Sequence, residues 1–247
     1  MNFSYKPNRT SVDLNKPQTT EPDYASKTAE YFAVARPEML CFVPANCRRL
    51  LDVGCGTGTF GASLKKQNPQ IEVWGVEPFA SAAAIAADKL DRVITGPFEP
   101  ETDLPAGAFD CIVFNDVLEH MVAPELALRY AKHLLSAGGT ILASIPNVRH
   151  FPVLWQLGAR GIWEYGECGL LDRTHLRFFT KSSILRMFQS EGYAVRSISG
   201  INPYVGIPNA SRRLWFAYRV ANAIFMGKFA DLKFQQFAVV AEPIALR

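Results

Sequence analysis

Short apolar runs alternate with amphipathic stretches along most of the chain. A run such as 109–114 is apolar at nearly every position, which is typical of a strand buried on both faces of a sheet. Strands and helices alternate with a period of roughly 25 to 30 residues, so we expect right-handed βαβ units and a parallel sheet. The predicted strands are 49–53, 71–76, 92–95, 109–114, 140–145, 193–199 and 234–241, and the predicted helices are 29–41, 61–67, 80–89, 124–135 and 181–191.

The alternation stops after Pro146. Residues 147–180 show no clear period and carry glycines and aromatics, and connections of that length are usually lids or binding loops. A later insert contains a predicted helix, 209–226, that is apolar around much of its circumference. We therefore predict a loose arm over 1–28 and one domain over 29–247, with substrate-facing inserts at about 147–180 and 200–233.

The composition is that of a single globular domain. The chain has 247 residues, of which 49% are hydrophobic and 20% are charged, enough for a three-layer core. Its net charge of +3 is too small to indicate a nucleic-acid partner. Five cysteines without metal-ligand spacing indicate reduced thiols, and no apolar leader or bilayer-length run is found, so we expect a cytoplasmic protein.

The first predicted strand ends at an acid that is followed by three alternating glycines. These residues are Asp52, Gly54, Gly56 and Gly58. Glycine is needed where the backbone takes a positive φ or lies directly against a ligand. A turn of this kind that leads into a helix therefore predicts a nucleotide-binding loop.

The same turn also fits the dinucleotide fingerprint Gly-x-Gly-x-x-Gly over 56–61. Two features argue against NAD. Asp52 would repel a pyrophosphate, whereas it can accept a hydrogen bond from an ammonium group. A dinucleotide enzyme also has no use for the two acids and the histidine that follow the fourth strand, Asp116, Glu119 and His120. The turn thus favours a nucleotide whose tail is an amino acid.

The glycine turn and the segment 115–121 together resemble the motifs of class I S-adenosylmethionine-dependent methyltransferases. The resemblance extends from about Tyr31 to Pro243 and implies an α/β, Rossmann-like doubly wound sheet, mostly parallel with an antiparallel terminal strand, plus lid inserts. It implies S-adenosylmethionine as the cofactor, with Glu77 accepting both ribose hydroxyls and with Arg36 near the cofactor's carboxylate. The expected cofactor-binding residues are Asp52, Gly54, Cys55, Gly56, Gly58, Phe60, Glu77, Pro78, Phe98, Asn115, Asp116, Val117 and Tyr31.

One position departs from the pattern of this family. Relatives commonly place an acid directly after the glycine that follows the third strand, to bind the adenine amino group. Here Pro97 follows Gly96. We expect Phe98 to contact the adenine instead, with Glu99 as an alternative.

Methyl transfer to a hydroxyl needs a group that removes its proton, and histidine is the natural base near neutral pH. We expect His120 first and His175 second in this role, with Asp116 beside them. His175 lies in the segment 171–180, which is similar to one in methyltransferases of glycan and ubiquinone pathways. With Glu119, these residues also match the metal-binding set of small-RNA 2′-O-methyltransferases, except that Asp116 replaces a Glu. A divalent metal and a metal-free acid–base cluster both stay open.

The leading prediction is an enzyme that O-methylates a small hydroxylated acceptor, such as a sugar of a surface glycan. The alternatives are a cofactor-binding scaffold without catalysis and a methyltransferase for RNA or another acceptor. No nucleic-acid partner is expected, because the chain has no basic run and no base-flipping motif. Three roles stay open for helix 209–226: a cap over the acceptor pocket, a peripheral membrane contact, or a homodimer face.

Overall fold

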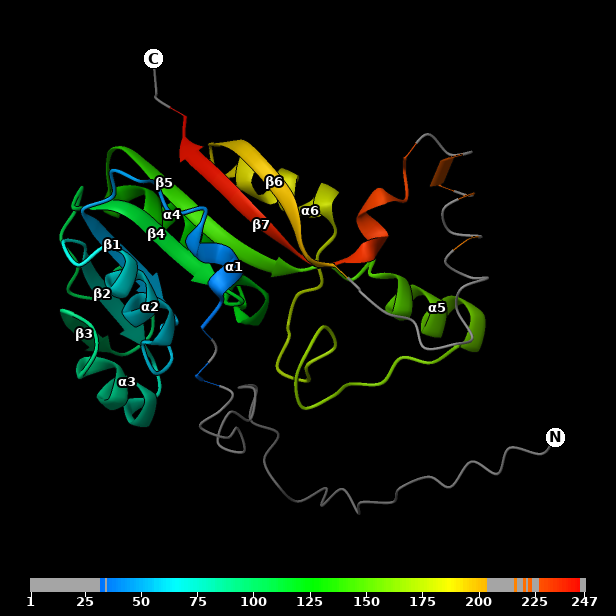
Figure 1. Ribbon diagram of the computed structural model, residues 1–247, viewed down its shortest axis with the longest axis horizontal. Coiled ribbons are helices and arrows are strands. Elements are labelled where there is room, and N and C mark those ends of the chain that lie inside the picture. Colours follow the sequence, from blue (N-terminus) through cyan, green and yellow to red (C-terminus); the bar gives the residue numbers. More distant parts are fainter. Residues whose placement is uncertain are drawn as a thin grey trace.

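The structure is a computed structural model that describes residues 32, 33, 35–203, 216, 220, 222, 223 and 227–244. Its described strands form one sheet in the order β3-β2-β1-β4-β5-β7-β6 (Figure 1). Strands β1 to β5 pair in parallel, and β7 runs antiparallel to both β5 and β6. The predicted fold class is therefore confirmed. The strands are β1 (Arg49–Val53), β2 (Glu72–Glu77), β3 (Arg92–Thr95), β4 (Phe109–Asn115), β5 (Leu135–Pro146), β6 (Tyr193–Pro203) and β7 (Phe234–Pro243).

The core lies in two layers, one on each face of the sheet. Alternate residues of β1 point to opposite faces, so that Leu50 packs in one cluster while Leu51 and Val53 pack in the other. The Leu50 cluster also takes side chains from α1, α2 and α3, and the second cluster takes them from α4 and α6. These helices are α1 (Pro37–Leu40), α2 (Thr59–Gln67), α3 (Ala80–Ala87), α4 (Pro124–Leu134) and α6 (Lys181–Ser190).

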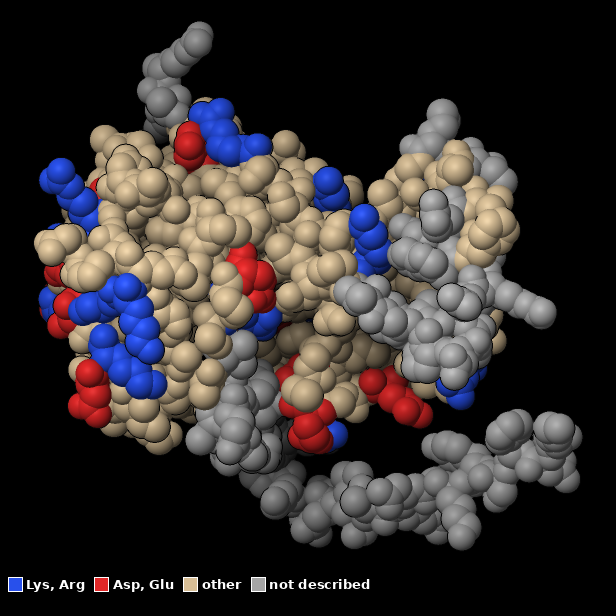
Figure 2. Space-filling model, in the orientation of Figure 1, with Lys and Arg blue, Asp and Glu red and all other residues tan. Residues whose placement is uncertain are grey.

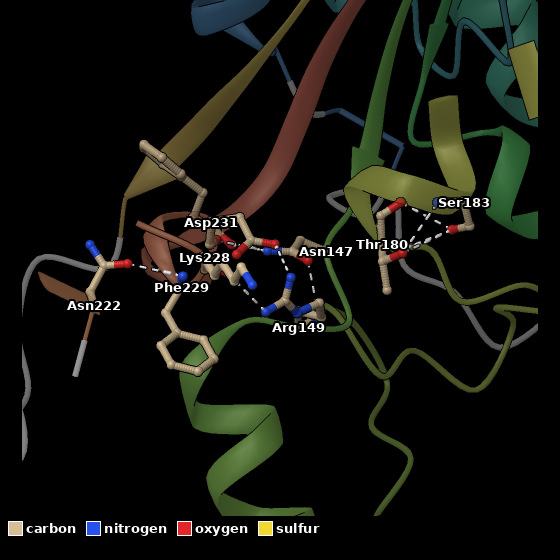
Figure 3. A network of polar contacts seen from close by, with 9 residues as sticks. Asn147, Arg149, Thr180, Ser183, Asn222, Lys228, Phe229 and Asp231 are labelled. Carbon is tan, nitrogen blue, oxygen red and sulfur yellow. Dashed lines mark hydrogen bonds and ion pairs between the residues drawn. The ribbon is translucent and has the colours of Figure 1, made fainter. Parts of the chain in front are cut away.

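Thr180 caps the start of α6. The Thr180 hydroxyl accepts from the backbone N–H of Ser183 at 3.2 Å, and the Thr180 N–H donates to the Ser183 hydroxyl at 2.9 Å (Figure 3). This reciprocal pair is a capping box, and it satisfies two backbone donors that the first turn of the helix leaves free.

Several predicted elements differ in extent from the structure, and one helix was not predicted. The helix expected over 29–41 is helical only in α1 among its described residues, because Arg36 takes a left-handed backbone with φ of 46° before Pro37. Strand β5 begins at Leu135 rather than at residue 140. Its register with β4 shifts between Leu135 and Thr140, the stretch that contains Gly138 and Gly139. The insert 147–180 contains a helix, α5 (Phe151–Arg160), that the sequence pattern did not indicate.

Helix α5 was missed because its sequence gives mixed signals. Pro152 suggests a break, yet proline is well tolerated in the first turn, where its missing N–H would have no partner. Gly161 ends the helix in the left-handed region with φ of 64°. Most of its residues are exposed, so the helix adds few side chains to the core.

A polar network fastens the start of the first insert to the end of the second (Figure 3). The buried amide of Asn147 donates to the carbonyl oxygens of Asp231 at 2.9 Å and Phe234 at 3.0 Å, and its oxygen accepts from the N–H of Arg149 at 3.0 Å. The Arg149 guanidinium also pairs with the Asp231 carboxylate at 2.9 Å. These contacts hold η3 (Ala230–Lys233) and the start of β7 against the carboxyl end of β5.

We expect Asn147→Ala to lower the free energy of unfolding by about 2–3 kcal/mol, because it leaves buried backbone carbonyls without donors. Urea denaturation measures this loss. Asn222→Ala is the matched control, since among the described residues the Asn222 side chain makes one hydrogen bond, accepting from the N–H of Phe229 at 2.9 Å. It should cost less than about 1 kcal/mol. Equal losses of unfolding free energy in the two variants would contradict the stabilising role assigned to Asn147.

Among the described helices, none has the length and apolarity needed to cross a membrane. The predicted arm over 1–28 and Tyr31 lie outside the described residues. Most of the predicted helix 209–226 does as well, and its described residues 216, 220, 222 and 223 are helical.

Candidate functional site

The glycine loop between β1 and α2 is held tightly by other parts of the chain. Gly54, Gly56 and Gly58 have φ of 67°, 54° and 72°, a region that side chains disfavour. A Cβ on Gly54 would come within 2.7 Å of a Val117 methyl, and one on Gly56 would overlap the carbonyl oxygen of Phe32. Contacts within the protein therefore require glycine at positions 54 and 56, whether or not a ligand also lies against the loop.

Phe32 crosses the glycine loop. Its carbonyl oxygen accepts from the Thr57 N–H at 3.0 Å and from the Thr57 hydroxyl at 3.3 Å. Its ring packs against Phe79, with ring centroids 5.4 Å apart. The sequence analysis missed this residue, because no motif marks a backbone carbonyl that docks on a distant loop.

We expect Gly56→Ala to weaken S-adenosylmethionine binding at least tenfold, because the new methyl group would push Phe32 off the loop and strain the backbone. Calorimetry measures the affinity. Gly138→Ala is the matched control, since Gly138 has φ of 78° and open space around it. Both variants should lose about 1 kcal/mol of stability from backbone strain, but Gly138→Ala should bind the cofactor normally.

Two buried acids lie beneath the loop, Asp52 at β1 and Glu77 at the end of β2. The Glu77 carboxylate accepts from the N–H groups of Gly56 at 2.8 Å and Phe79 at 3.0 Å. Burial raises the pKa of Glu77, and these two N–H groups counteract the rise. Burial and the nearby Glu77 charge raise the pKa of Asp52 to about 8. Glu77 is thus fixed in place, with lone pairs left for ribose hydroxyls.

Asn115 ends β4 beside this loop. Both polar atoms of its side chain are buried, and neither forms a hydrogen bond with a described residue. A buried amide without partners is costly unless a ligand supplies them. Asn115 therefore fits the predicted role at the cofactor.

Asp116 follows with an unfavourable φ of 54°. Its carboxylate accepts from the Ser144 hydroxyl at 2.9 Å and the Gln236 amide at 2.8 Å, and it pairs with the guanidinium of Arg36. The expected grouping is thus corrected, because Asp116 bonds to these other residues and is not one of the three described residues whose donor atoms gather within 4.8 Å of one another. Gln236, on β7, was not identified from the sequence.

Glu119, His120 and His175 come together as predicted, and their nearest donor atoms all lie within 4.8 Å of one another. The His120 and His175 rings are 4.6 Å apart, and Nε2 of His175 lies 3.9 Å from the Glu119 carboxylate. Nδ1 of His120 is 3.1 Å from the carbonyl oxygen of Thr174, and Nδ1 of His175 is 3.2 Å from that of Leu170. Burial raises the pKa of Glu119 to about 8, and neither of its oxygens has a hydrogen-bond partner among the described residues.

Backbone hydrogen bonds bring these distant residues together. The N–H groups of Leu176 and Arg177 both donate to the carbonyl oxygen of Glu119, at 2.8 and 3.0 Å. The Asp172 carboxylate accepts from the N–H of Thr174 at 2.8 Å and from its hydroxyl at 2.7 Å. The first insert is thus bonded directly to η2 (Leu118–His120), the turn that carries Glu119 and His120.

Three predicted cofactor residues direct their side chains into the protein. The Cys55 thiol packs against Gly75 of β2, and Phe60 is buried in the core. The Phe98 ring packs on Phe114 and Tyr130, with centroids 5.7 and 4.9 Å away. These rings fill the core because apolar burial outweighs contact with a polar nucleotide.

A hollow of about 240 Å³ lies at the end of β3. It is lined by Thr95, Gly96, Pro97 and Glu99, and not by Phe98. The contact of Phe98 or Glu99 with adenine stays a prediction. Pro78 is exposed at the neighbouring strand end.

The family follows from comparison with known proteins. Residues 19–198 match the family model described as "Methyltransferase domain". The chain belongs to this methyltransferase family, and its cofactor is S-adenosylmethionine. An S-adenosylmethionine-dependent methyltransferase from Archaeoglobus fulgidus has the same fold, with a TM-score of 0.58, 19% identity, and coverage of 87% of this chain and 94% of that one.

Two curated relatives of this methyltransferase share the name ubiquinone biosynthesis O-methyltransferase. The protein from Aeromonas salmonicida is 27% identical over 161 residues, which span 63% of this chain and 66% of the relative. The protein from Nitrobacter winogradskyi is 32% identical over 161 residues, spanning 62% of this chain and 59% of the relative. The chain thus spans less than two thirds of the length of each relative.

Proposed function

We propose that this methyltransferase transfers the methyl group of S-adenosylmethionine to a hydroxyl oxygen of a small acceptor. The cluster of Glu119, His120 and His175 carries the proposal, because it gathers a buried carboxylate and two imidazoles just beyond Asn115. In the transfer, the acceptor oxygen forms a bond to the methyl carbon while the carbon–sulfur bond breaks and its electron pair stays on sulfur. The hydroxyl proton must move to a base, and this cluster supplies one.

His120 is the proposed base. The carbonyl oxygen of Thr174 can only accept, and the Thr174 hydroxyl, also 3.1 Å from Nδ1 of His120, donates its hydrogen to Asp172. Nδ1 of His120 therefore carries a hydrogen and Nε2 is left to take the proton. The same argument places a hydrogen on Nδ1 of His175 and turns its Nε2 toward the Glu119 carboxylate. In its ionised form, Glu119 stabilises the positive charge that the imidazole pair gains.

The same three side chains can also hold a divalent cation. Their donor set, one carboxylate and two imidazoles, suits Zn²⁺ or Mn²⁺, and the unpartnered oxygens of Glu119 fit a ligand role. When bound, a cation lowers the pKa of an acceptor hydroxyl. Thermal melting of the chelated protein with added Mn²⁺ or Zn²⁺ tests this option: a rise that Glu119→Gln abolishes supports a metal, and no rise supports the metal-free cluster.

The proposed acceptor is a neutral ring with neighbouring hydroxyls, as in a sugar of a surface glycan. The names of the relatives support oxygen as the acceptor atom. On the face drawn in Figure 2, the basic side chains of described residues lie in separate small groups, among acidic and uncharged residues, which favours a small acceptor over a nucleic acid. We place the reaction in the cytoplasm, supported by five cysteines that are all free thiols.

Calorimetry with S-adenosylmethionine and with NAD tests the cofactor, and release of S-adenosylhomocysteine over a panel of sugars and phenols tests the reaction. His120→Asn and His175→Asn should each keep the cofactor affinity and lose turnover by about 100-fold or more. Loss of cofactor binding in either variant would contradict the roles assigned to the two histidines. Cofactor binding without methylation of any acceptor would favour a non-catalytic scaffold.

A further inference from the structure

Three aromatic rings of the first insert pack together at its surface. Trp163 meets Phe178 with centroids 5.3 Å apart and Tyr165 with centroids 6.4 Å apart, and both pairs are close to perpendicular. Tyr165 also lies 6.2 Å from Phe178. We call Trp163, Tyr165 and Phe178 the aromatic wall. Tyr165 is 50% exposed and the other two are partly buried, so the wall faces solvent and is not part of the core.

The aromatic wall is continuous with the proposed catalytic cluster. The Phe178 ring lies 6.4 Å from the His175 ring, which in turn lies 4.6 Å from the His120 ring. The two N–H groups that donate to Glu119, from Leu176 and Arg177, fix the intervening backbone. A molecule that contacts the wall is therefore held beside the groups that would take its proton.

Hydrogen bonds hold the loop that carries the wall in one conformation. The Gly166 N–H donates to the carbonyl oxygen of Leu171 at 2.8 Å, and the Arg173 N–H donates to the carbonyl oxygen of Gly166 at 3.0 Å. Backbone hydrogen bonds thus fix the shape of the loop. The aromatic rings are not needed for this and can contact a ligand. Exposed apolar surface beside convergent polar groups is typical of a binding site.

The charges along the loop favour a neutral ligand. Arg173 pairs with Glu167 at 2.6 Å, and Arg177 donates to the carbonyl oxygen of Val122 at 2.5 Å. Both arginines of the described segment 161–180 are thus engaged within the protein.

We propose that the aromatic wall binds the acceptor ring, which is a neutral ring with an apolar face and neighbouring hydroxyl groups. This inference rests on the proposed methyl transfer for the identity of the ligand as acceptor. The wall contacts one face of the ring, as tryptophan and tyrosine do where a ligand has an apolar face and polar edges, and the hydroxyls point to His120. A sugar and a phenolic ring both have this chemistry.

Ligand-observed NMR with the complex of protein and S-adenosylhomocysteine tests the wall without turnover. The probes are catechol for a phenolic ring and methyl α-mannopyranoside and methyl α-rhamnopyranoside for a sugar. We expect the wild-type protein to transfer saturation to the ring protons of either the phenolic probe or the sugar probes. Tyr165→Leu should weaken binding of that probe at least tenfold. Tyr165→Phe keeps the ring and should restore it.

Trp155→Leu is the matched control, because Trp155 is 44% exposed on α5 and lies outside the wall. It should bind the probe as the wild type does, and unchanged melting temperatures confirm that all variants fold.

Failure of all three probes to bind the wild type, or binding that survives Tyr165→Leu, overturns the proposal. If the probe binds at the wall but releases no S-adenosylhomocysteine from S-adenosylmethionine, the proposed function fails and the wall stands. If the wild type methylates an acceptor and Tyr165→Leu leaves the KM for that acceptor unchanged, the proposed role of the aromatic wall is wrong and the proposed methyl transfer is supported.

Discussion

Replacing Glu119 with glutamine is expected to abolish turnover and to make the folded protein more stable. The Glu119 carboxylate is fully buried, and its two oxygens lack hydrogen-bond partners among the described residues. Burial raises its pKa from 4.5 to about 8, so ionisation destabilises the fold increasingly as the pH rises between these values. Glutamine cannot ionise, which removes this cost but also removes the charge that supports His175.

Urea denaturation should show a gain on the order of 1–2 kcal/mol for Glu119→Gln at pH 8 and a much smaller gain at pH 5. Turnover should fall by about 100-fold or more, with cofactor affinity unchanged. The control is Glu164→Gln, an exposed glutamate of the same insert, which should change neither quantity. A variant that loses stability at pH 8, or that keeps normal turnover, would show that Glu119 is not the buried, unpaired acid described above.

The sheet could be predicted because its signals are local. β1 and β3 have the bounds that the apolar pattern predicts, and Thr180 caps α6 as its position indicates. These features depend on a few adjacent residues, so the alternation of apolar and polar positions is sufficient to locate them. Helix α5 was missed because Pro152, in its first turn, suggests a break in the chain's regular structure.

The candidate site could be predicted only in part, because it depends on contacts between distant segments. The pairing of His120 with His175 followed from a family resemblance, and spacing alone gives no reason for it. No pattern indicated that Gln236 would donate to Asp116, because a polar residue in a strand normally suggests a solvated face. The same holds for Phe32, whose backbone carbonyl makes the contact with the glycine loop.

The glycine loop shows how one sequence signal can have two physical causes. The sequence analysis assigned its glycines to close contact with a nucleotide. The structure adds Val117 beside Gly54 and Phe32 beside Gly56, so both positions exclude a side chain even without a ligand. A loop held between two distant segments in this way is already shaped before the cofactor binds, which reduces the entropy lost on binding.

Asp52→Asn is expected to stabilise the protein without cofactor and to weaken its affinity for S-adenosylmethionine. Burial and the Glu77 charge raise the pKa of Asp52 from 3.8 to about 8. Between these pH values the folded state keeps a proton that the unfolded state has lost, so stability falls as the pH rises. Asparagine stays neutral, and the variant should gain on the order of 2 kcal/mol at pH 8 and little at pH 4.

Asp110→Asn is the opposite control. Although burial raises the pKa of Asp110, the N–H groups of Arg48 and Arg49 and the Ser136 hydroxyl more than offset this, and the net pKa is lowered. Its carboxylate therefore stabilises the fold at neutral pH, and that contribution is lost as the pH falls. Asp110→Asn should be destabilising at pH 7, so stabilisation by Asp52→Asn cannot be a general effect of removing a carboxylate.

The cofactor affinity of the wild type should then rise with pH toward 8. The ammonium group of S-adenosylmethionine favours ionised Asp52, so binding must release the proton that the free protein holds there. Calorimetry in buffers of different ionisation enthalpy measures this proton release, and Asp52→Asn should abolish it and bind about tenfold more weakly. Binding that releases no proton in the wild type would mean that Asp52 does not contact the ammonium group.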